Sequence, residues 1–237
     1  MTSGLETSRF VVCGDPRADR FIFDIPPVWW SRGYEYEWAS RFARTDDVAL
    51  DAASGICHPL KFYLADHCRE VHACDLDPRI DLPAAIREEV AEVFGADAAA
   101  NLPSKYLDGV CYAKAALDAM PYADETFDRV YCISVLEHLD DGFNRYPLCG
   151  RLRPLLRHIP GWKQDVRRTL KEFKRVLKQG GQVVLTFDYP RINLAYFGVV
   201  VREVGLRYAG PVDDRLPADA IHEPRKKLHC YRAVLTR

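Results

Sequence analysis

Two apolar runs that each end in an acid constrain this chain more than any other feature. The first run, VALD, ends at Asp51 and leads into the turn AASG, whose one glycine is Gly55. The second run, EVHACD, ends at Asp75. Small residues let the backbone approach a ligand closely, and an acid after the second strand can accept hydrogen bonds from ribose hydroxyls. The pattern predicts a nucleotide-binding βαβ unit with residues 60–67 as its helix.

The turn is not a dinucleotide fingerprint, because it has one glycine where G-x-G-x-x-G needs three. This favours a ligand without a pyrophosphate. The segment LDAASG resembles the first motif of the class I S-adenosylmethionine-dependent methyltransferases. Two positions depart from that family, since Ala53 and Cys57 stand where it usually carries glycine.

A second segment carries the same resemblance. Residues 115–139, AALDAMPYADETFDRVYCISVLEHL, are similar to the family's link between its third and fourth strands and to the fourth strand itself. Ala116 stands where an aspartate usually contacts the adenine amine. That contact is therefore expected from Asp118 or from the backbone near Leu117.

Strand and helix patterns alternate over most of the chain, which predicts a mostly parallel sheet with helices on both faces. We expect strands at residues 48–51, 70–75, 109–113, 127–134, 182–187 and 228–235, helices at 34–42, 60–67, 84–94, 169–177 and 194–205, and a loop at 101–108. Residues 10–13 are expected to form either a short strand or an ordered extension. The pair Gly180-Gly181 is expected to cap a helix. The resemblance implies a Rossmann-like, doubly wound α/β fold with an antiparallel last strand. The length and the hydrophobic content of 48% predict a single domain over residues 1–237.

An aromatic cap over about residues 20–44 precedes the first core strand and holds three of the four tryptophans. One interpretation is a structural helix that covers a sheet edge. The other is a lid over the cofactor, in which Arg32 pairs with a carboxylate and Tyr36 donates a hydrogen bond. The resemblance makes the lid plausible for these two residues only.

A basic insertion over about residues 139–163 separates this chain from smaller members of the family. It holds Arg151 and Arg153 among interleaved apolar residues. Three readings compete: a solvated helix face, a substrate lid that recognises an anionic group, and a contact with nucleic acid or membrane. Asp188 and Tyr189, after the fifth strand, are further substrate-side candidates.

The resemblance also implies the cofactor site, for S-adenosylmethionine with S-adenosylhomocysteine as product. The cofactor-binding residues are expected to be Arg32, Tyr36, Asp51, Ala52, Ala53, Ser54, Gly55, Asp75, Leu76, Leu117, Asp118, Ser134 and Val135. Asp77 is the alternative to Asp75 as the ribose acceptor. His138 and Glu137 are the candidate catalytic bases, and a solvated first helical turn is their alternative. Methyl transfer needs such a base less than hydrolysis does, because the methyl group is already activated.

The net charge, the apolar runs and the cysteine spacing limit which partners the chain is expected to bind. The net charge of −1 argues neither for nucleic acid, an unlikely partner, nor for a membrane surface, and no apolar run approaches the length of a membrane span. Eight cysteines are scattered without C-x-x-C spacing, which favours a reducing, cytoplasmic setting. The pairs Cys57-His58 and His67-Cys68 and the triplet His72-x-Cys74 match no common zinc spacing, so no metal is expected.

These observations lead to one functional prediction. The chain is expected to transfer a methyl group in line from S-adenosylmethionine to an oxygen or nitrogen of a small molecule, which carries an anionic group in the lid reading. The alternatives are a non-catalytic module that binds S-adenosylmethionine or S-adenosylhomocysteine for regulation or assembly and, less favoured, a nicotinamide-dependent oxidoreductase.

Overall fold

The computed structural model describes residues 4–139 and 165–237. Its strands are Ser8–Phe10 (β1), Arg20–Phe21 (β2), Phe23–Asp24 (β3), Val48–Ala52 (β4), Glu70–Asp75 (β5), Val110–Lys114 (β6), Phe127–Ile133 (β7), Leu177–Tyr189 (β8), Arg207–Tyr208 (β9), Val212–Asp213 (β10), His222–Glu223 (β11) and Leu228–Thr236 (β12). Its α-helices are Arg32–Ser40 (α1), Leu60–His67 (α2), Pro83–Phe94 (α3), Ala96–Ala100 (α4), Lys105–Asp108 (α5), Asp165–Val176 (α7) and Leu194–Glu203 (α8). Short 3-10 helices span Gly4–Glu6 (η1) and Leu136–His138 (η2).

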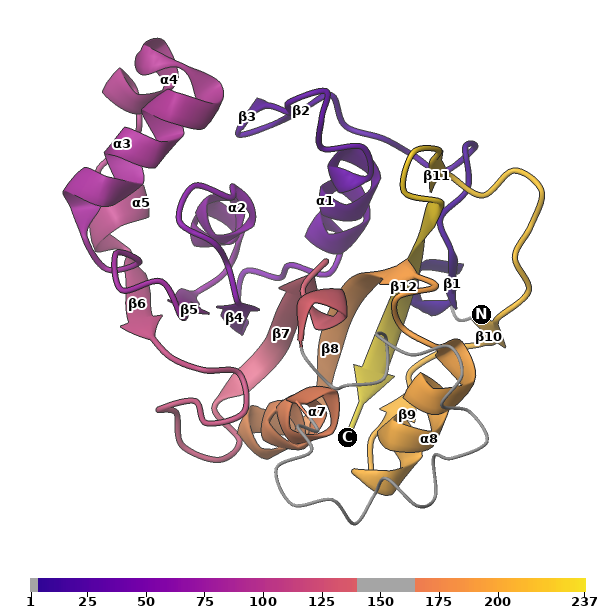
Figure 1. The fold of residues 1–237 in the computed structure, drawn as a ribbon. Coiled ribbons are helices and arrows are strands. Elements are labelled where there is room, and N and C mark those ends of the chain that lie inside the picture. Colours follow the sequence, from indigo (N-terminus) through magenta and orange to yellow (C-terminus); the bar gives the residue numbers. More distant parts are fainter. Residues whose placement is uncertain (1–3, 140–164) are drawn as a thin grey trace.

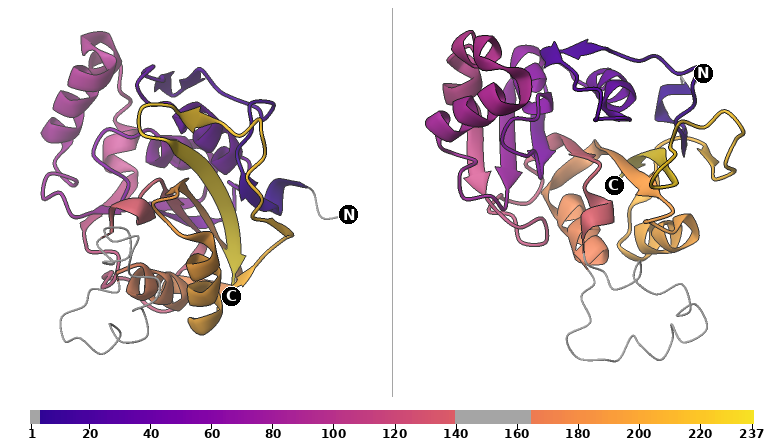
Figure 2. Two further views of the ribbon diagram at one scale, coloured as in Figure 1. Left: turned by 45° about the vertical axis from the view of Figure 1, so that its right-hand side comes forward. Right: turned by 45° about the horizontal axis from the view of Figure 1, so that its top comes forward.

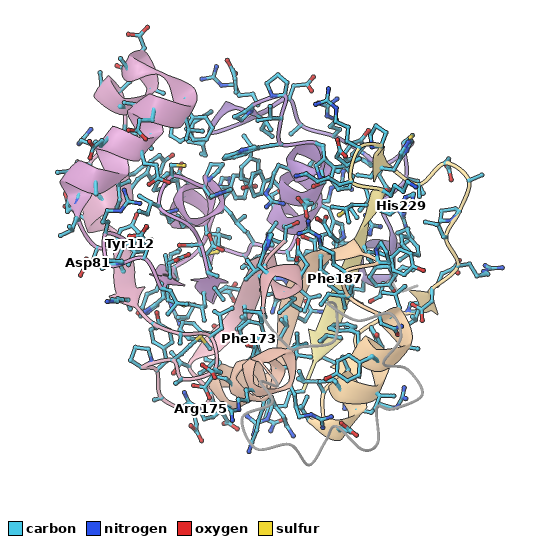
Figure 3. All side chains as sticks on the ribbon, viewed as in Figure 1. Asp81, Tyr112, Phe173, Arg175, Phe187 and His229 are labelled. Atoms are coloured by element: carbon cyan, nitrogen blue, oxygen red, sulfur yellow. The ribbon has the colours of Figure 1, made fainter. Side chains whose placement is uncertain are left out.

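Helices cover both faces of the central sheet, as the alternating pattern predicts. Along β7, Val130 and Cys132 face one apolar cluster and Tyr131 faces another, because successive side chains of a strand point to opposite faces. The first cluster includes Phe173 of α7 and Phe187 of β8 (Figure 3). Figure 1 shows α7 and α8 on this side of the sheet and α1 and α2 on the other.

The strand order defines where a ligand can bind. The main path of the sheet is β10-β1-β12-β8-β7-β4-β5-β6, and β4 pairs in parallel with both β5 and β7. The chain thus moves outward from β4 to β6 and returns to β7 on the other side of β4. In doubly wound sheets, ligands lie beyond the carboxyl ends of the strands at such a reversal.

The last strand is antiparallel, which confirms the expectation. β12 pairs with β8 from His229 opposite Tyr189 to Thr236 opposite Gln182. Its other edge is covered in pieces by β11, β1 and β9. The N-terminal β1 is therefore built into the sheet. It lies at Ser8–Phe10, slightly earlier than the expected strand at 10–13.

Helices α3, α4 and α5 gather at the β6 edge, away from α7 and α8 (Figure 2). The expected loop at 101–108 is wrong in part, because Lys105–Asp108 forms α5. The cause is packing: Tyr106 stacks on Phe62 of α2 with ring centroids 5.1 Å apart. None of the helices in the described ranges is long and apolar enough to cross a bilayer.

The expectation that Gly180-Gly181 caps a helix is wrong. α7 ends at Val176, and β8 starts at once with the fully buried Leu177 opposite Phe127. The register then jumps to Gln182 opposite Arg129, so that four residues of β8, 178–181, stand against the single residue Asp128 of β7. Gly180 has φ 75°. Its left-handed backbone serves an irregularity inside a strand, which glycine permits without strain.

Candidate functional site

A pocket of about 210 Å³ lies at the carboxyl ends of β4, β5 and β7, beside α1. Nine of the residues predicted to bind a cofactor line it: Arg32, Tyr36, Asp51, Ala53, Ser54, Gly55, Asp75, Ser134 and Val135. His58, Leu60 and Ile133 complete the lining and were not predicted. The fold therefore brings the aromatic cap and both strand-end acids to one site.

The turn after β4 has the backbone shape that a glycine-rich loop usually provides. Ala53 has φ 54° and Gly55 has φ 59°, both in the left-handed region. A Cβ atom on Gly55 would lie 2.6 Å from Cδ2 of His58, so a side chain does not fit there. Ala53 adopts a conformation that costs an L-residue about 1 kcal/mol. The turn thus keeps the glycine-like shape although its second residue is alanine.

Asp75 holds this turn from the end of the neighbouring strand. The amide of Gly55 donates to its Oδ2 at 2.9 Å, and the amide of Asp77 donates to its Oδ1 at 3.0 Å. A carboxylate has about four acceptor positions, so each oxygen keeps a lone pair after these bonds. Since Asp75 lines the pocket, these lone pairs are available to hydroxyl donors such as those of a ribose.

Asp51 is a buried acid without a hydrogen-bond partner at one of its oxygens. The residue is 3% exposed, and its Oδ2 has no donor among the described residues. Burial raises the pKa of Asp51 to about 7; the charge of Asp75 adds to the rise and Lys61 opposes it. A buried acceptor that the protein leaves unpaired fits a donor group of a ligand, an ammonium above all.

Lys61 is a buried cation of this turn that sequence reasoning missed. Its Nζ donates to the carbonyl oxygens of Gly55 at 2.7 Å, His58 at 2.8 Å and Ser54 at 3.4 Å. These three acceptors match the three donors of the ammonium group. Burial lowers its pKa to about 8, against the opposing charge of Asp51. Lys61 therefore stabilises the backbone conformation of the turn through these three carbonyl groups.

Glu35 joins the cap helix to the ends of the strands and was also missed. Its carboxylate is bonded to Ser31 Oγ (3.0 Å), the guanidinium of Arg32, Ser134 Oγ (2.6 Å), Thr186 Oγ1 (2.5 Å) and Cys230 Sγ (3.6 Å). Burial alone would raise the pKa of Glu35, but Arg32 and the hydroxyl donors outweigh it, and the pKa is lowered. Glu35 therefore stays ionised and orients Arg32 beside the pocket.

Tyr36 is held by a second set of contacts on α1. Its hydroxyl shares a 2.8 Å hydrogen bond with Nδ1 of His58. The His58 ring in turn stacks on Trp29, with centroids 4.4 Å apart and planes 9° from parallel. Burial lowers the pKa of His58 to about 3, and the charges of Arg32 and Lys61 add to this. His58 is thus a neutral ring that positions Tyr36.

Both candidate bases lie on η2, directly after β7. Glu137 is buried, and its Oε2 has no partner among the described residues. Burial raises its pKa to about 8, and the charges of Asp188 and Glu35 add to the rise. His138 is exposed, and partial burial together with Arg191 lowers its pKa. At pH 7 Glu137 is therefore mostly protonated, whereas His138 is neutral and able to accept a proton.

Some predicted residues lie elsewhere. Ala52 is fully buried in β4, Leu117 is 7% exposed in the core, and Leu76 is 67% exposed. Asp118 forms a 3.8 Å ion pair with Arg168 of α7. These four residues do not line the pocket, and their role in cofactor binding stays a prediction.

The substrate candidates fall into two groups. Asp188 and Tyr189 are the last two residues of β8 and do not follow it as expected, because both pair with β12. Burial raises the pKa of Asp188, which lies near Glu137. Tyr189 packs edge-on against Phe10 of β1, with ring centroids 5.3 Å apart. Arg151 and Arg153, with nearly all of the basic insertion, lie outside the described residues.

One group in the described part of the chain has the atoms of a metal site. The ligand atoms of Glu70, His72 and Cys111 lie within 4.8 Å of one another, on β5 and β6. His72 Nε2 and Glu70 Oε1 are 2.7 Å apart and share a hydrogen bond with each other. None of the three residues lines the pocket.

Comparisons with known proteins agree with this geometry. A family model described as a methyltransferase domain matches residues 50–146. No curated protein matches the chain at a significant level. Among solved structures, a TehB-like SAM-dependent methyltransferase from Corynebacterium glutamicum is 16% identical, covers 86% of each chain and has a TM-score of 0.50. The YcgJ protein from Bacillus subtilis is 13% identical, covers 85% of this chain and 95% of its own, and has a TM-score of 0.51.

The same fold also occurs in the [4+2]-cyclase SpnF, which is 16% identical, covers 84% of this chain and 63% of its own, and has a TM-score of 0.50. At these identities the solved structures show a shared fold. The family model adds that residues 50–146 are similar to a methyltransferase domain.

Proposed function

We propose that this protein methylates an oxygen or nitrogen of a small molecule that carries an anionic group. The observation that supports it most is the unpartnered Asp51 oxygen in the same pocket as Asp75. Asp75 would hold the ribose of the cofactor, Asp51 its ammonium group, and Arg32 its carboxylate. When bound, S-adenosylmethionine supplies an activated methyl group, so that the protein has mainly to position the acceptor.

The acceptor would bind beside η2 and the end of β8. Because the pKa of His138 is lowered, a ring nitrogen of this residue is free at pH 7 to take the proton that the acceptor loses. Arg191 and Lys226 form no ion pair within the described residues, and both lower the pKa of His138. They would attract an anionic group of the acceptor. Nucleic acid is a less suitable partner, because the chain as a whole is not basic.

Calorimetry with S-adenosylmethionine and S-adenosylhomocysteine tests the cofactor roles. We expect Asp75→Ala to weaken binding by about 1–3 kcal/mol, because a ribose acceptor and the anchor of the Gly55 amide are lost together. Asp77→Ala is the matched control, since Asp77 is the competing acid and contacts Arg79 at the surface. The control should change affinity about twofold or less. Unchanged binding in Asp75→Ala would remove that residue from its role.

Turnover must be measured apart from binding, because a non-catalytic cofactor-binding module is the alternative function. The cyclase SpnF has this fold, so the fold alone does not define the reaction. A screen of anionic amines, alcohols and phenols for S-adenosylhomocysteine release should identify an acceptor. His138→Ala should then lower kcat at pH 7 and above, and the loss should shrink as the pH falls and the wild-type ring becomes protonated. Cofactor binding without turnover on any acceptor would favour the alternative. A cytoplasmic location belongs to the same proposal; the seven cysteines of the described residues are free thiols.

A further inference from the structure

A second cavity, of about 480 Å³, lies on the other side of the cap helix. Arg32 and Tyr36 of α1 line the pocket at the strand ends, whereas Tyr34 and Trp38 line this cavity. Glu37 and Arg41 line it from the same helix and its end, and the other walls come from the N-terminal segment and from β12. The cavity is therefore separate from the site of the proposed methyl transfer.

Two arginines lie directly opposite each other in its wall. Arg9 of β1 is the cross-strand partner of Arg232 of β12 in the antiparallel ladder. Like charges in this arrangement repel each other and destabilise the strand pair. A negative charge between them is needed to offset the repulsion.

Asp15 supplies that charge, but mostly to Arg9. Its Oδ2 accepts from the amide of Val12 and from Arg9, each at 2.9 Å, and its Oδ1 accepts from the same guanidinium. The distance from Asp15 Oδ1 to the nearest nitrogen of Arg232 is 3.8 Å, which is beyond a hydrogen bond. Asp15 thus neutralises Arg9 and leaves Arg232 largely uncompensated.

Arg232 is a buried guanidinium without a hydrogen bond within the described residues. The residue is 5% exposed, its Nε is buried and unpartnered, and it stacks on the Trp38 ring at 5.2 Å. A guanidinium carries five donors, and leaving a buried charge unpaired costs several kcal/mol. Burial lowers its pKa to about 10, and the positive charge of Arg9 adds to this.

The other charged residues of the cavity do not correct the imbalance. Arg41 is paired with Glu37, whose Oε1 accepts from its Nε at 3.0 Å and from a terminal nitrogen at 2.5 Å. The lining thus holds three arginines and two carboxylates, an excess of one positive charge. That excess sits on Arg232.

We propose that this cavity binds a small molecule through an oxyanion, a carboxylate or phosphate group, held by Arg232. The planar guanidinium can meet such a group with two parallel hydrogen bonds, and the stacked Trp38 fixes its plane. Arg9 lies close enough to add attraction without giving up Asp15. The inference does not depend on the methyl acceptor.

Fluorescence titration with inorganic phosphate and with citrate, against chloride at equal ionic strength, tests the site, because Trp38 contacts Arg232 directly. The wild-type protein should give a saturable change with at least one of the two anions. Arg232→Met should weaken binding at least tenfold. Arg215→Met is the matched control, since Arg215 is exposed, paired with Asp213 and outside the cavity. It should leave the affinity unchanged.

Asp15→Asn should change the anion affinity in the opposite direction. It tests the proposed anion site even if Arg232→Met does not fold. Loss of the competing carboxylate should tighten anion binding at least threefold, while a purely structural role of Arg232 predicts no such gain. No saturable change in the wild-type protein, equal affinity in Arg232→Met, or weaker binding in Asp15→Asn would each overturn the proposal.

Discussion

Helix α1 and strand β4 each hold a buried acid, Glu35 beside Arg32 of the pocket and Asp51 in the pocket lining, and the two acids are in opposite states. Glu35 on α1 is satisfied by five groups, and its pKa is lowered. Asp51 has an oxygen without any partner, and burial raises its pKa to about 7. A fully bonded buried acid stabilises the fold, whereas an unpaired one is a group that a ligand can satisfy. We infer that the two regions divide support and binding between them.

The largest expected effect is on the supporting acid. Glu35→Gln keeps the shape of the side chain but leaves the Arg32 guanidinium buried without a counter-ion. We expect it to lower the free energy of unfolding by about 3–5 kcal/mol, as measured by urea denaturation. Glu37→Gln on the same helix is the control, because Glu37 is partly exposed and should cost about 1 kcal/mol or less. Equal losses of unfolding free energy in the two variants would contradict the supporting role of Glu35.

Asp51→Asn should stabilise the protein, in contrast to Glu35→Gln, and the size of this effect should depend on pH. The folded-state pKa of Asp51 is raised, so its contribution to stability is complete below about pH 4 and is lost as the pH rises to about 7. Thermal unfolding at pH 8 should show the variant more stable than the wild type by roughly 4 kcal/mol, with no difference near pH 4. Calorimetry should show weaker cofactor binding in the same variant.

The control for this pH profile is Asp81→Asn, because Asp81 is exposed and lies before α3 (Figure 3). It should leave the difference between pH 4 and pH 8 as it is in the wild type. A pH profile of Asp51→Asn that overlays the wild type would show that the Asp51 carboxylate is already satisfied in the folded protein.

The smallest effect concerns the backbone of the turn. Ala53→Gly should raise the free energy of unfolding by about 0.5–1 kcal/mol, because glycine adopts φ 54° without strain. Ala52→Gly, one residue earlier in the strand, should lower it by about 1 kcal/mol. Thermal unfolding of both variants measures the contrast, and a loss of stability in Ala53→Gly would mean that the methyl group contributes packing.

Local patterns were sufficient for the sheet and for much of the pocket. The acids at residues 51 and 75 end strands, and strand ends of a doubly wound sheet meet at one edge, so their proximity follows from the pattern. The turn after β4 could also be predicted, because the small residues at 52–55 allow its backbone shape. Asp75 was preferred over Asp77 because it matches the end of the corresponding strand in the family that the chain resembles, and its role in binding is still a prediction.

The supporting network could not be predicted in this way. The hydroxyls of Ser134 and Thr186 that bind Glu35 lie 99 and 151 residues away in the sequence, and the Cys230 thiol lies 195 residues away. Such contacts depend on the final packing of α1, which no local pattern encodes. Lys61 offered one signal, a charged residue between Leu60 and Phe62 on a buried helix. The start of β8 was missed for a related reason. Gly180 and Gly181 suggested the end of a helix, but Leu177 is already buried as the first residue of the strand.

The Glu35 network has a kinetic consequence. Since one carboxylate binds groups of α1, β8 and β12 together, α1 cannot separate from the sheet without exposing the ion pair and breaking the bonds to both strands. The amides of α1 should therefore exchange with solvent through the same rare opening as those of β8, not through independent fraying of the cap. Helix α1 should then stay in place as a fixed wall of the pocket while ligands enter and leave.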